Sequence, residues 1–271
     1  METKQFETAN LTIQDNGIAI VEFNRPRQLN AINEQLIVDI PEAFKIAQEN
    51  HDIKVVVLTG AGKGFSSGGD ISTLAGMKNP IHAKDTYDAS TGIVKAVYEM
   101  DKPVIAAVNG PVAGASLATM MACDMIIAAD TARFGFTFMQ VAFLPDSGTS
   151  YFLAQKVGYH KALEILWYGK ILTAQEADDL GLVNKLVPTE ECLPEAIRWA
   201  EKLAQQPMMS VEWDKKLMRA ALKNDFYEQA DMESMYQLLT WSSPDFMEGA
   251  MSFAEKRKPV FNQKTRWDLR K

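Results

Sequence analysis

Two glycine-rich turns are the stretches of this sequence best suited to chemistry. The first, GAGKGFSSGGDI, covers residues 60–71, and the second lies within VNGPVAGASLATMMACD, residues 108–124. Each follows an apolar run that is typical of a buried strand and leads into a helix-like segment. The first N–H groups of a helix have no partner within it, and glycine and alanine let a ligand approach the backbone closely. Two such turns side by side would direct two N–H donors at one negatively charged oxygen.

A second chemical feature is Asp146, which is the one carboxylate between Thr131 and Leu163. It follows the strongly apolar run FGFTFMQVAFLP, residues 134–145. Apolar surroundings disfavour the charged form of a carboxyl group, which raises its pKa and makes it a better base near neutral pH. The alternative is that Asp146 or Ser147 caps the helix that follows, and one carboxylate can serve both purposes.

The elements that must position these groups alternate between strands and helices. We expect strands at residues 11–13, 18–23, 54–59, 103–108, 125–129, 132–136 and 182–187. Between them the pattern predicts helices at residues 33–48, 85–100, 114–122, 147–157 and 161–168, a short helix from 173, and a mobile loop over 72–84. Beyond residue 194 only helices follow, near 194–205, 208–223, 225–241 and 244–256. This order predicts an α/β core with a parallel sheet over residues 1–193 and a helical region over 194–271.

The composition limits the classes of function. The chain has 271 residues, of which 47% are hydrophobic and 23% charged, and its net charge is −7, which argues against a nucleic-acid partner. No apolar run is long enough to span a membrane, and the first residues lack a signal-peptide core. The three histidines lack metal-ligand spacing, so we expect no metal. The two cysteines, in apolar segments, are expected to be buried free thiols of a cytoplasmic protein.

Several spaced motifs resemble the enoyl-CoA hydratase/isomerase, or crotonase, superfamily. The resemblance covers about residues 11–262 and lies in NRPRQLNA, GKGFSSGGDI, KPVIAAVNGPVAGASLATMMACDMIIA, ARFGF and LTAQEADDLGLVNKLVP. It implies an α/β fold built as a spiral of ββα units, with a helical C-terminal region that forms homotrimers or homohexamers. It also implies an acyl-CoA thioester as the ligand, with no separate cofactor because coenzyme A is part of the substrate.

The resemblance also assigns residues to the site. The oxyanion donors would be the backbone N–H groups of Gly69 and Ala115, and Ala115 would lie in the first turn of its helix, where the positive end of the helix dipole favours an anion. The residues that match the CoA-binding positions of the family lie on or near the first turn: Arg27 near the CoA phosphates, Leu29 packed nearby, and Ser67, Asp70 and Ile71 along the stretch that accepts the adenine end.

The chain departs from the hydratases of this superfamily at two positions. Those enzymes place and activate water with two glutamates, and the matching positions here are Ala118 and Phe138. Neither side chain can transfer a proton. Members that shift double bonds with a single carboxylate carry an aspartate at the position of Asp146, and so does the branch that dehalogenates aromatic acyl-CoA.

We therefore expect an enoyl-CoA isomerase. The thioester oxygen would accept hydrogen bonds from the Gly69 and Ala115 amides, while Asp146 moves a proton from C2 to C4. Phe136, Phe138, Phe143 and residues of the 72–100 region would line an acyl pocket and exclude water. Three alternatives remain open at this point: an enoyl-CoA hydratase with a rearranged site, an aryl-CoA dehalogenase with Asp146 as the nucleophile, and a non-catalytic acyl-CoA-binding scaffold.

Overall fold

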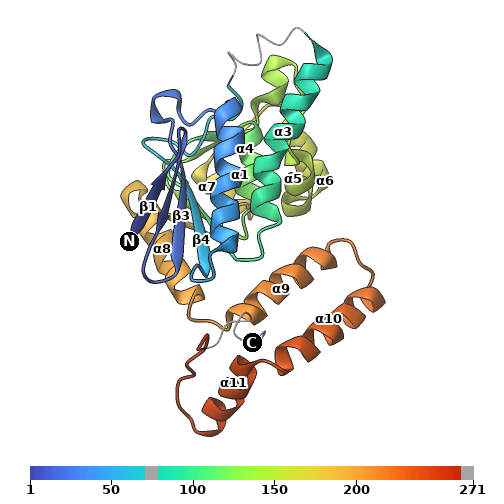
Figure 1. The fold of residues 1–271 in the computed structure, drawn as a ribbon. Coiled ribbons are helices and arrows are strands. Elements are labelled where there is room, and N and C mark those ends of the chain that lie inside the picture. Colours follow the sequence, from blue (N-terminus) through green and yellow to red (C-terminus); the bar gives the residue numbers. More distant parts are fainter. Residues whose placement is uncertain (71–78, 264–271) are drawn as a thin grey trace.

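The computed structural model describes residues 1–70 and 79–263 and has a central sheet with the strand order β1-β2-β3-β4-β5-β7-β10 (Figure 1). The strands β1, β2 and β3 pair antiparallel, and from β3 onward the pairing is parallel. Their bounds are Glu2–Gln5, Ala9–Ile13, Ile18–Phe23, Val55–Gly60, Val104–Val108, Met125–Ala129 and Lys185–Val187. The strands β4 and β5 are buried along their whole length, as continuous apolar runs in a parallel sheet require.

A second, smaller sheet brings the two glycine-rich turns together. It contains β6 (Val112–Ala113), β8 (Arg133–Gly135) and β9 (Ile171–Thr173). The strand β6 leads directly into helix α4 (Ala115–Ala122). An isolated bridge between Ser66 and Val112 joins the first turn to this sheet.

Helices cover both faces of the central sheet. On one face α1 packs on β2 and β3 and against α3, which in turn packs against α4, whereas α8 packs across β4, β5 and β7. The further helices α5, α6 and α7 follow the second turn (Figure 1). The bounds of these helices are Glu34–Glu49 (α1), Pro80–Tyr98 (α3), Thr149–Val157 (α5), Tyr159–Trp167 (α6), Ala174–Asp179 (α7) and Cys192–Leu203 (α8), with short 3₁₀ helices at Pro26–Gln28 (η1), Thr137–Val141 (η2) and Thr189–Glu191 (η3).

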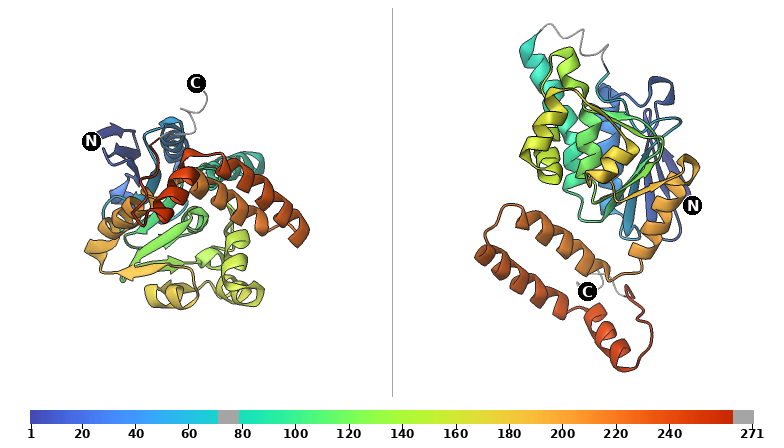
Figure 2. Two further views of the ribbon diagram at one scale, coloured as in Figure 1. Left: turned by 90° about the horizontal axis from the view of Figure 1, so that it is seen from below. Right: turned by 180° about the vertical axis from the view of Figure 1, so that it is seen from behind.

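The last three helices form an arm that extends away from this core. These are α9 (Met208–Ala221), α10 (Phe226–Trp241) and α11 (Pro244–Ala254), and the arm stands apart from the core in Figure 1 and in the right view of Figure 2. Ion pairs tie α9 to the core, because Asp124 lies 2.6 Å from the Lys215 ammonium and 3.0 Å from the Arg219 guanidinium. None of the residues of α10 is buried.

The structure confirms the predicted α/β core and corrects three details. The strand β1 was not predicted, because its four residues are exposed and largely polar. Helix α3 begins at Pro80, so the end of the predicted loop over residues 72–84 is helical, while residues 71–78 lie outside the described residues. The boundary predicted at residue 194 divides α8, although this helix packs on the sheet and buries Cys192, Ala196 and Ala200.

Three of the predictions made from the composition can be compared with the described residues. Both cysteines are buried free thiols, as predicted. No helix over residues 1–70 and 79–263 has the length and apolar character needed to cross a membrane. The same residues hold no cluster of three or more metal-ligating side chains. A cytoplasmic location stays a prediction.

Candidate active site

The first glycine-rich turn passes very close to the second. Gly68 has φ +86°, and a Cβ on it would lie 2.6 Å from the Ala113 carbonyl oxygen and 3.1 Å from the Gly114 Cα. Only glycine allows this approach, because any side chain would push the two backbones apart. The next residue, Gly69, forms a parallel bridge with Ile32, in which the Ile32 N–H donates to the Gly68 carbonyl at 2.8 Å.

The second turn completes a pair of adjacent amides. Gly114 has φ +55° and immediately precedes α4, and a Cβ on it would lie 3.5 Å from the Gly68 Cα and 4.0 Å from the Gly69 nitrogen. Ala115 is the first residue of α4, where N–H groups have no intrahelical partner. Within the described part of the chain, neither the Gly69 nor the Ala115 N–H donates a backbone hydrogen bond. The predicted pair of donors is therefore brought together.

Buried polar side chains hold these two turns in place. The Asn30 side-chain amide donates to three carbonyl oxygens of the first turn, those of Ala61 at 3.0 Å, Gly64 at 2.9 Å and Phe65 at 3.2 Å. The Ser66 hydroxyl donates to the Asn30 carbonyl at 2.7 Å and lies 2.6 Å from the Ser116 hydroxyl on α4. Such a network fixes the donor positions before a ligand binds, which is what anion stabilisation requires.

Asp146 lies between η2 and α5, in a loop with unusual backbone conformations. Ala142 and Ser147 have φ of +55° and +51°, in the left-handed region that non-glycine residues rarely occupy. The Oδ1 atom of Asp146 is buried and has no hydrogen-bond partner among the described residues. Burial raises the pKa of this carboxyl to about 6. The capping alternative is wrong, because the N-cap of α5 is Gly148 and no side chain hydrogen-bonds to that helix end.

One cavity of about 180 Å³ is lined by both glycine-rich turns and by Asp146. Gly69 and Ala115 lie on its wall with Asp146, and apolar side chains of η2 and the following loop continue that wall. The described residues that line it are Ile32, Asn33, Glu34, Ile37, Ser67, Gly69, Asp70, Thr86, Tyr87, Ser90, Ala113, Gly114, Ala115, Thr137, Phe138, Val141, Phe143 and Asp146. Two backbone donors beside a carboxyl group with a raised pKa can stabilise an enolate and move a proton next to it.

The predicted CoA-binding residues do not all reach this cavity. Ser67 and Asp70 line it, and the Asp70 carboxylate also pairs with the Arg25 guanidinium at 3.3 Å. Arg27, within η1, and Leu29, directly after η1, are exposed and lie outside the cavity wall. Ile71 lies outside the described residues.

Of the three phenylalanines predicted to line an acyl pocket, two do so. Phe138 lines the cavity from η2, and Phe143 lines it from the loop that follows. Phe136 does not, because its N–H donates to the Lys170 carbonyl at 2.8 Å at the end of β8 and its side chain is fully buried in the core. This part of the prediction is wrong, since the backbone stays with the second sheet for one residue beyond β8 before it turns toward the cavity.

The sequence prediction placed the 72–100 region, which includes α3, at the acyl pocket without naming its residues, and it missed the contribution of α1. Tyr87 lies on α3 with its ring 6.3 Å from that of Phe143, and burial and then the nearby Asp146 charge raise the pKa of Tyr87. The Ser90 hydroxyl lies 3.3 Å from that of Ser147, next to the candidate base. From the start of α1 come its N-cap Asn33 together with Glu34 and Ile37. No local motif marks Glu34, Ile37, Tyr87 or Ser90 for this site, because each is an ordinary helical residue until the tertiary fold places it here.

Comparison with known proteins identifies the family. The family model described as enoyl-CoA hydratase/isomerase matches residues 13–264. A probable mitochondrial enoyl-CoA hydratase of Dictyostelium discoideum is 35% identical over 265 residues, which are 96% of this chain and 93% of that protein. The 1,2-epoxyphenylacetyl-CoA isomerase of Escherichia coli (strain K12) is 30% identical over 257 residues, 92% of this chain and 97% of that protein.

Solved structures show the same fold. The crystal structure of an enoyl-CoA hydratase from Bacillus anthracis has a TM-score of 0.91 and 29% sequence identity, and the match covers 95% of this chain and 100% of that one. The similarity thus extends over the core, the site and the helical arm together. The chain belongs to the enoyl-CoA hydratase/isomerase family and has the crotonase fold.

Proposed function

We propose that this protein is an enoyl-CoA isomerase that moves a double bond from C3–C4 to C2–C3 of an acyl thioester. One observation carries the proposal: Asp146, whose Oδ1 atom is buried without a hydrogen-bond partner among the described residues, lines the same cavity as Gly69 and Ala115. Asp146 is placed and tuned as a base, because its pKa of about 6 leaves it ionised at neutral pH while keeping it basic.

The proposed reaction needs one carboxylate and no added water. Asp146 removes a proton from C2, and the electron pair of that C–H bond delocalises onto the thioester oxygen. The Gly69 and Ala115 N–H groups donate to this oxygen and stabilise the dienolate. Asp146 then returns the proton at C4, and the double bond forms between C2 and C3. Coenzyme A is part of the substrate, and this chemistry asks for no separate cofactor.

Hydration of a 2-enoyl thioester is the second candidate, because most of the similar proteins found in the comparison carry hydratase names. The two positions at which the resemblance expects glutamates carry Ala118, which is fully buried on α4, and Phe138. A hydratase would need another group to activate water, and Glu34 is the exposed carboxylate on the cavity wall.

Two separate incubations decide between these reactions. We expect the protein to convert a 3-enoyl-CoA to the 2-enoyl isomer while leaving crotonyl-CoA unchanged, as measured by chromatography of the thioesters. Water addition to crotonyl-CoA without change in the 3-enoyl substrate would overturn the isomerase proposal in favour of the hydratase. A lack of both reactions, together with a lack of deuterium exchange at C2 of a saturated acyl-CoA, would leave a binding scaffold.

For the remainder of the substrate, we propose that the CoA portion extends from the cavity toward η1. Ser67 and Asp70 lie on the cavity wall, and the predicted contacts Arg27 and Leu29 are exposed around η1 next to the first glycine-rich turn. An Arg27 side chain that reaches the CoA phosphates would make binding salt-dependent. The contact between Arg27 and the CoA phosphates is tested by comparing the CoA-ester affinity of Arg27→Ala with that of the wild type at low salt.

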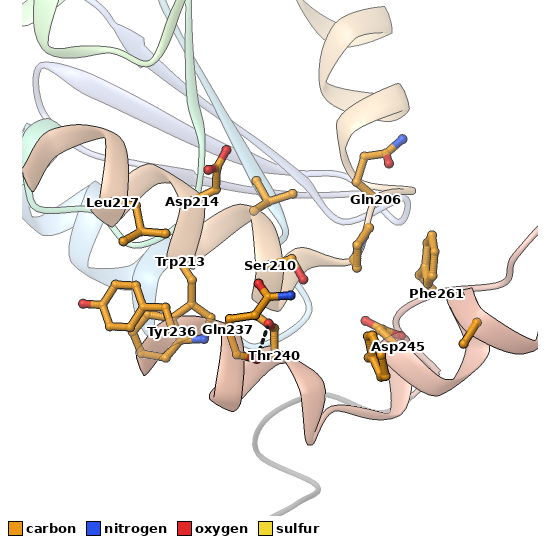
Figure 3. Close-up of a pocket in the computed structure, with 15 residues that line it drawn as sticks. Gln206, Ser210, Trp213, Asp214, Leu217, Tyr236, Gln237, Thr240, Asp245 and Phe261 are labelled. Carbon is orange, nitrogen blue, oxygen red and sulfur yellow. Dashed lines mark hydrogen bonds between the residues drawn. The ribbon is translucent and has the colours of Figure 1, made fainter. Parts of the chain in front are cut away.

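We also propose that the helical arm assembles with further copies of this chain, as a trimer or a pair of trimers. A cavity of about 610 Å³ lies among α9, α10 and α11, and the centroids of the Trp213 and Tyr236 rings there are 4.7 Å apart. Figure 3 shows the residues that line it. The Trp213 Nε1 atom is buried there without a hydrogen-bond partner among the described residues. Large apolar side chains are also exposed on α10 and α11, namely Met235, Leu238, Leu239, Trp241, Phe246, Met247, Met251 and Phe253. Sedimentation at micromolar concentration tests the assembly, and a monomer would refute it.

A further inference from the structure

Glu34 is a carboxylate on the wall of the acyl cavity to which neither the sequence motifs nor the proposed reaction assigns a role. It is the first residue of α1 and is exposed. It follows Ile32 by two residues, and the bridge between Ile32 and Gly69 places this end of α1 beside the oxyanion donors. Ile37, one helical turn further along, lines the same cavity, so this face of α1 is directed at the acyl site.

The charges around this cavity are unbalanced. Of the described residues that line it, Glu34, Asp70 and Asp146 are acidic, and none is lysine or arginine. Asp70 is paired with Arg25 at 3.3 Å, whereas Glu34 takes part in no ion pair among the described residues. The N-terminal end of α1 offsets part of the Glu34 charge through the helix dipole, an effect that is small at an exposed position.

We propose that Glu34 determines substrate specificity: it admits neutral acyl groups and rejects acyl groups that carry a second carboxylate. The inference rests on the proposed binding of the acyl thioester in this cavity. A carboxylate on the acyl chain would place another negative charge in the cavity that Glu34 lines together with the apolar side chains of Phe138, Val141 and Phe143. Water screens part of this repulsion because Glu34 is exposed, and the apolar side chains limit the screening on the cavity side. A neutral acyl chain experiences no repulsion, so the discrimination comes from an unfavourable contact with the wrong ligand.

The experiment compares two unreactive saturated thioesters of similar length, hexanoyl-CoA and glutaryl-CoA. Their affinities are measured by titration calorimetry for the wild type, Glu34→Gln and Glu42→Gln. Glu42 is the matched control, because it is an exposed glutamate of the same helix that does not line the cavity. The ratio of the two affinities isolates the interaction of Glu34 with the acyl carboxylate, since effects on folding or on CoA binding cancel in it.

We expect the wild type to prefer hexanoyl-CoA, and Glu34→Gln to reduce this preference by about ten-fold. Glu42→Gln should leave the preference unchanged. The preference of the wild type should also shrink as the salt concentration rises, while that of Glu34→Gln changes less. A preference that is equal in the wild type and Glu34→Gln would overturn the inference.

The outcome is independent of whether the proposed reaction is right. If Glu34→Gln alters the preference but the wild type does not isomerise a 3-enoyl-CoA, the specificity assignment stands and the reaction is wrong. If the wild type isomerises the neutral substrate and the preference does not respond to Glu34→Gln, the reaction stands and the specificity assignment is wrong. If the wild type binds neither thioester, both are overturned.

Discussion

The two sides of the proposed acyl cavity are built in different ways. The donor side consists of backbone, namely the turns at Gly68–Gly69 and Gly114–Ala115, packed so closely that a Cβ on Gly68 would lie 2.6 Å from the Ala113 carbonyl oxygen. The base side consists of side chains on η2, α3 and the Asp146 loop, where Val141 is 60% and Phe143 44% exposed. The donor side is held by main-chain contacts. The properties of the base side depend on how well partly exposed side chains shield the Asp146 carboxylate from water.

This difference separates two properties that an enolate-forming site requires. Stabilisation of an anion requires hydrogen-bond donors that do not move during the reaction. The close backbone contact between the two turns and the hydrogen bonds of the buried Asn30 hold the donors in this way. Proton transfer asks for a tuned pKa, which follows from the burial of Asp146 and can be adjusted by changing its neighbours. We expect substitutions on the base side to alter rate and pH dependence, and substitutions on the donor side to alter rate and stability together.

The largest effect should follow the substitution Asp146→Asn. Asparagine keeps the shape of the side chain but cannot take up the C2 proton, so turnover of a 3-enoyl-CoA should fall by roughly 10³-fold. Affinity for a CoA ester should stay within a few-fold, because no binding contact is removed. Steady-state kinetics and calorimetry measure the two quantities, and normal turnover in this variant would remove Asp146 from the mechanism.

Gly68→Ala should have the next largest effect, on the donor side. The new methyl group would meet the Ala113 carbonyl and force the two turns apart, so turnover should fall by about 10²-fold. The free energy of unfolding should also fall, by about 1–3 kcal/mol, because φ is positive here. The control is Gly181→Ala, where φ is +72° and nothing lies within 4 Å of the added Cβ. That variant should lose stability but keep its activity; equal losses of activity would contradict the interlocked donor side.

The pH dependence tests the tuning of the base. Turnover should rise as pH increases through about 6, where Asp146 ionises, and then level off. Because the folded carboxyl binds its proton more tightly than the ordinary value of 3.8 implies, ionisation opposes folding, and this cost grows between about pH 4 and 6. Asp146→Asn should therefore be more stable than the wild type at pH 8, by about 1–3 kcal/mol. Chemical denaturation at pH 5 and pH 8 measures the difference, and an equal difference at both pH values would refute the raised pKa.

The smallest effect should come from Ser90→Ala. The Ser90 hydroxyl contacts that of Ser147 at 3.3 Å and so links α3 to the loop that carries Asp146. Its loss should lower kcat by about three-fold with little change in KM, because the base becomes less well positioned. Thr91→Ala is the control, since the Thr91 hydroxyl donates to the Tyr87 carbonyl at 2.9 Å, as Ser90 also does, without an observed contact to that loop. An equal effect of both variants would show that only α3 itself is weakened.

Much of the donor side was predictable from sequence, because its causes are local. A buried apolar run, a glycine at the point where the chain turns, and a helix that begins with small residues are all visible in the order of residues. The base side was predictable only in part. The sequence marks Asp146 as the lone acid after an apolar run, but it cannot distinguish a capping from a catalytic position. In the structure Gly148, with φ +95°, is the N-cap of α5, so the helix begins after Asp146 and the Asp146 side chain does not cap it.

From the sequence alone follow the family, the alternation of strands and helices, the two glycine-rich turns, and the absence of glutamate at positions 118 and 138. Only the tertiary structure decided that Phe136 lies in the core, that α8 belongs with the sheet, and that Glu34 and Tyr87 face the acyl cavity. The physical reason is how far apart in the sequence the interacting residues are. Turn conformation and helix initiation depend on neighbours in sequence, whereas the exposure and electrostatic surroundings of a side chain depend on segments that are distant in sequence and meet only in the folded chain.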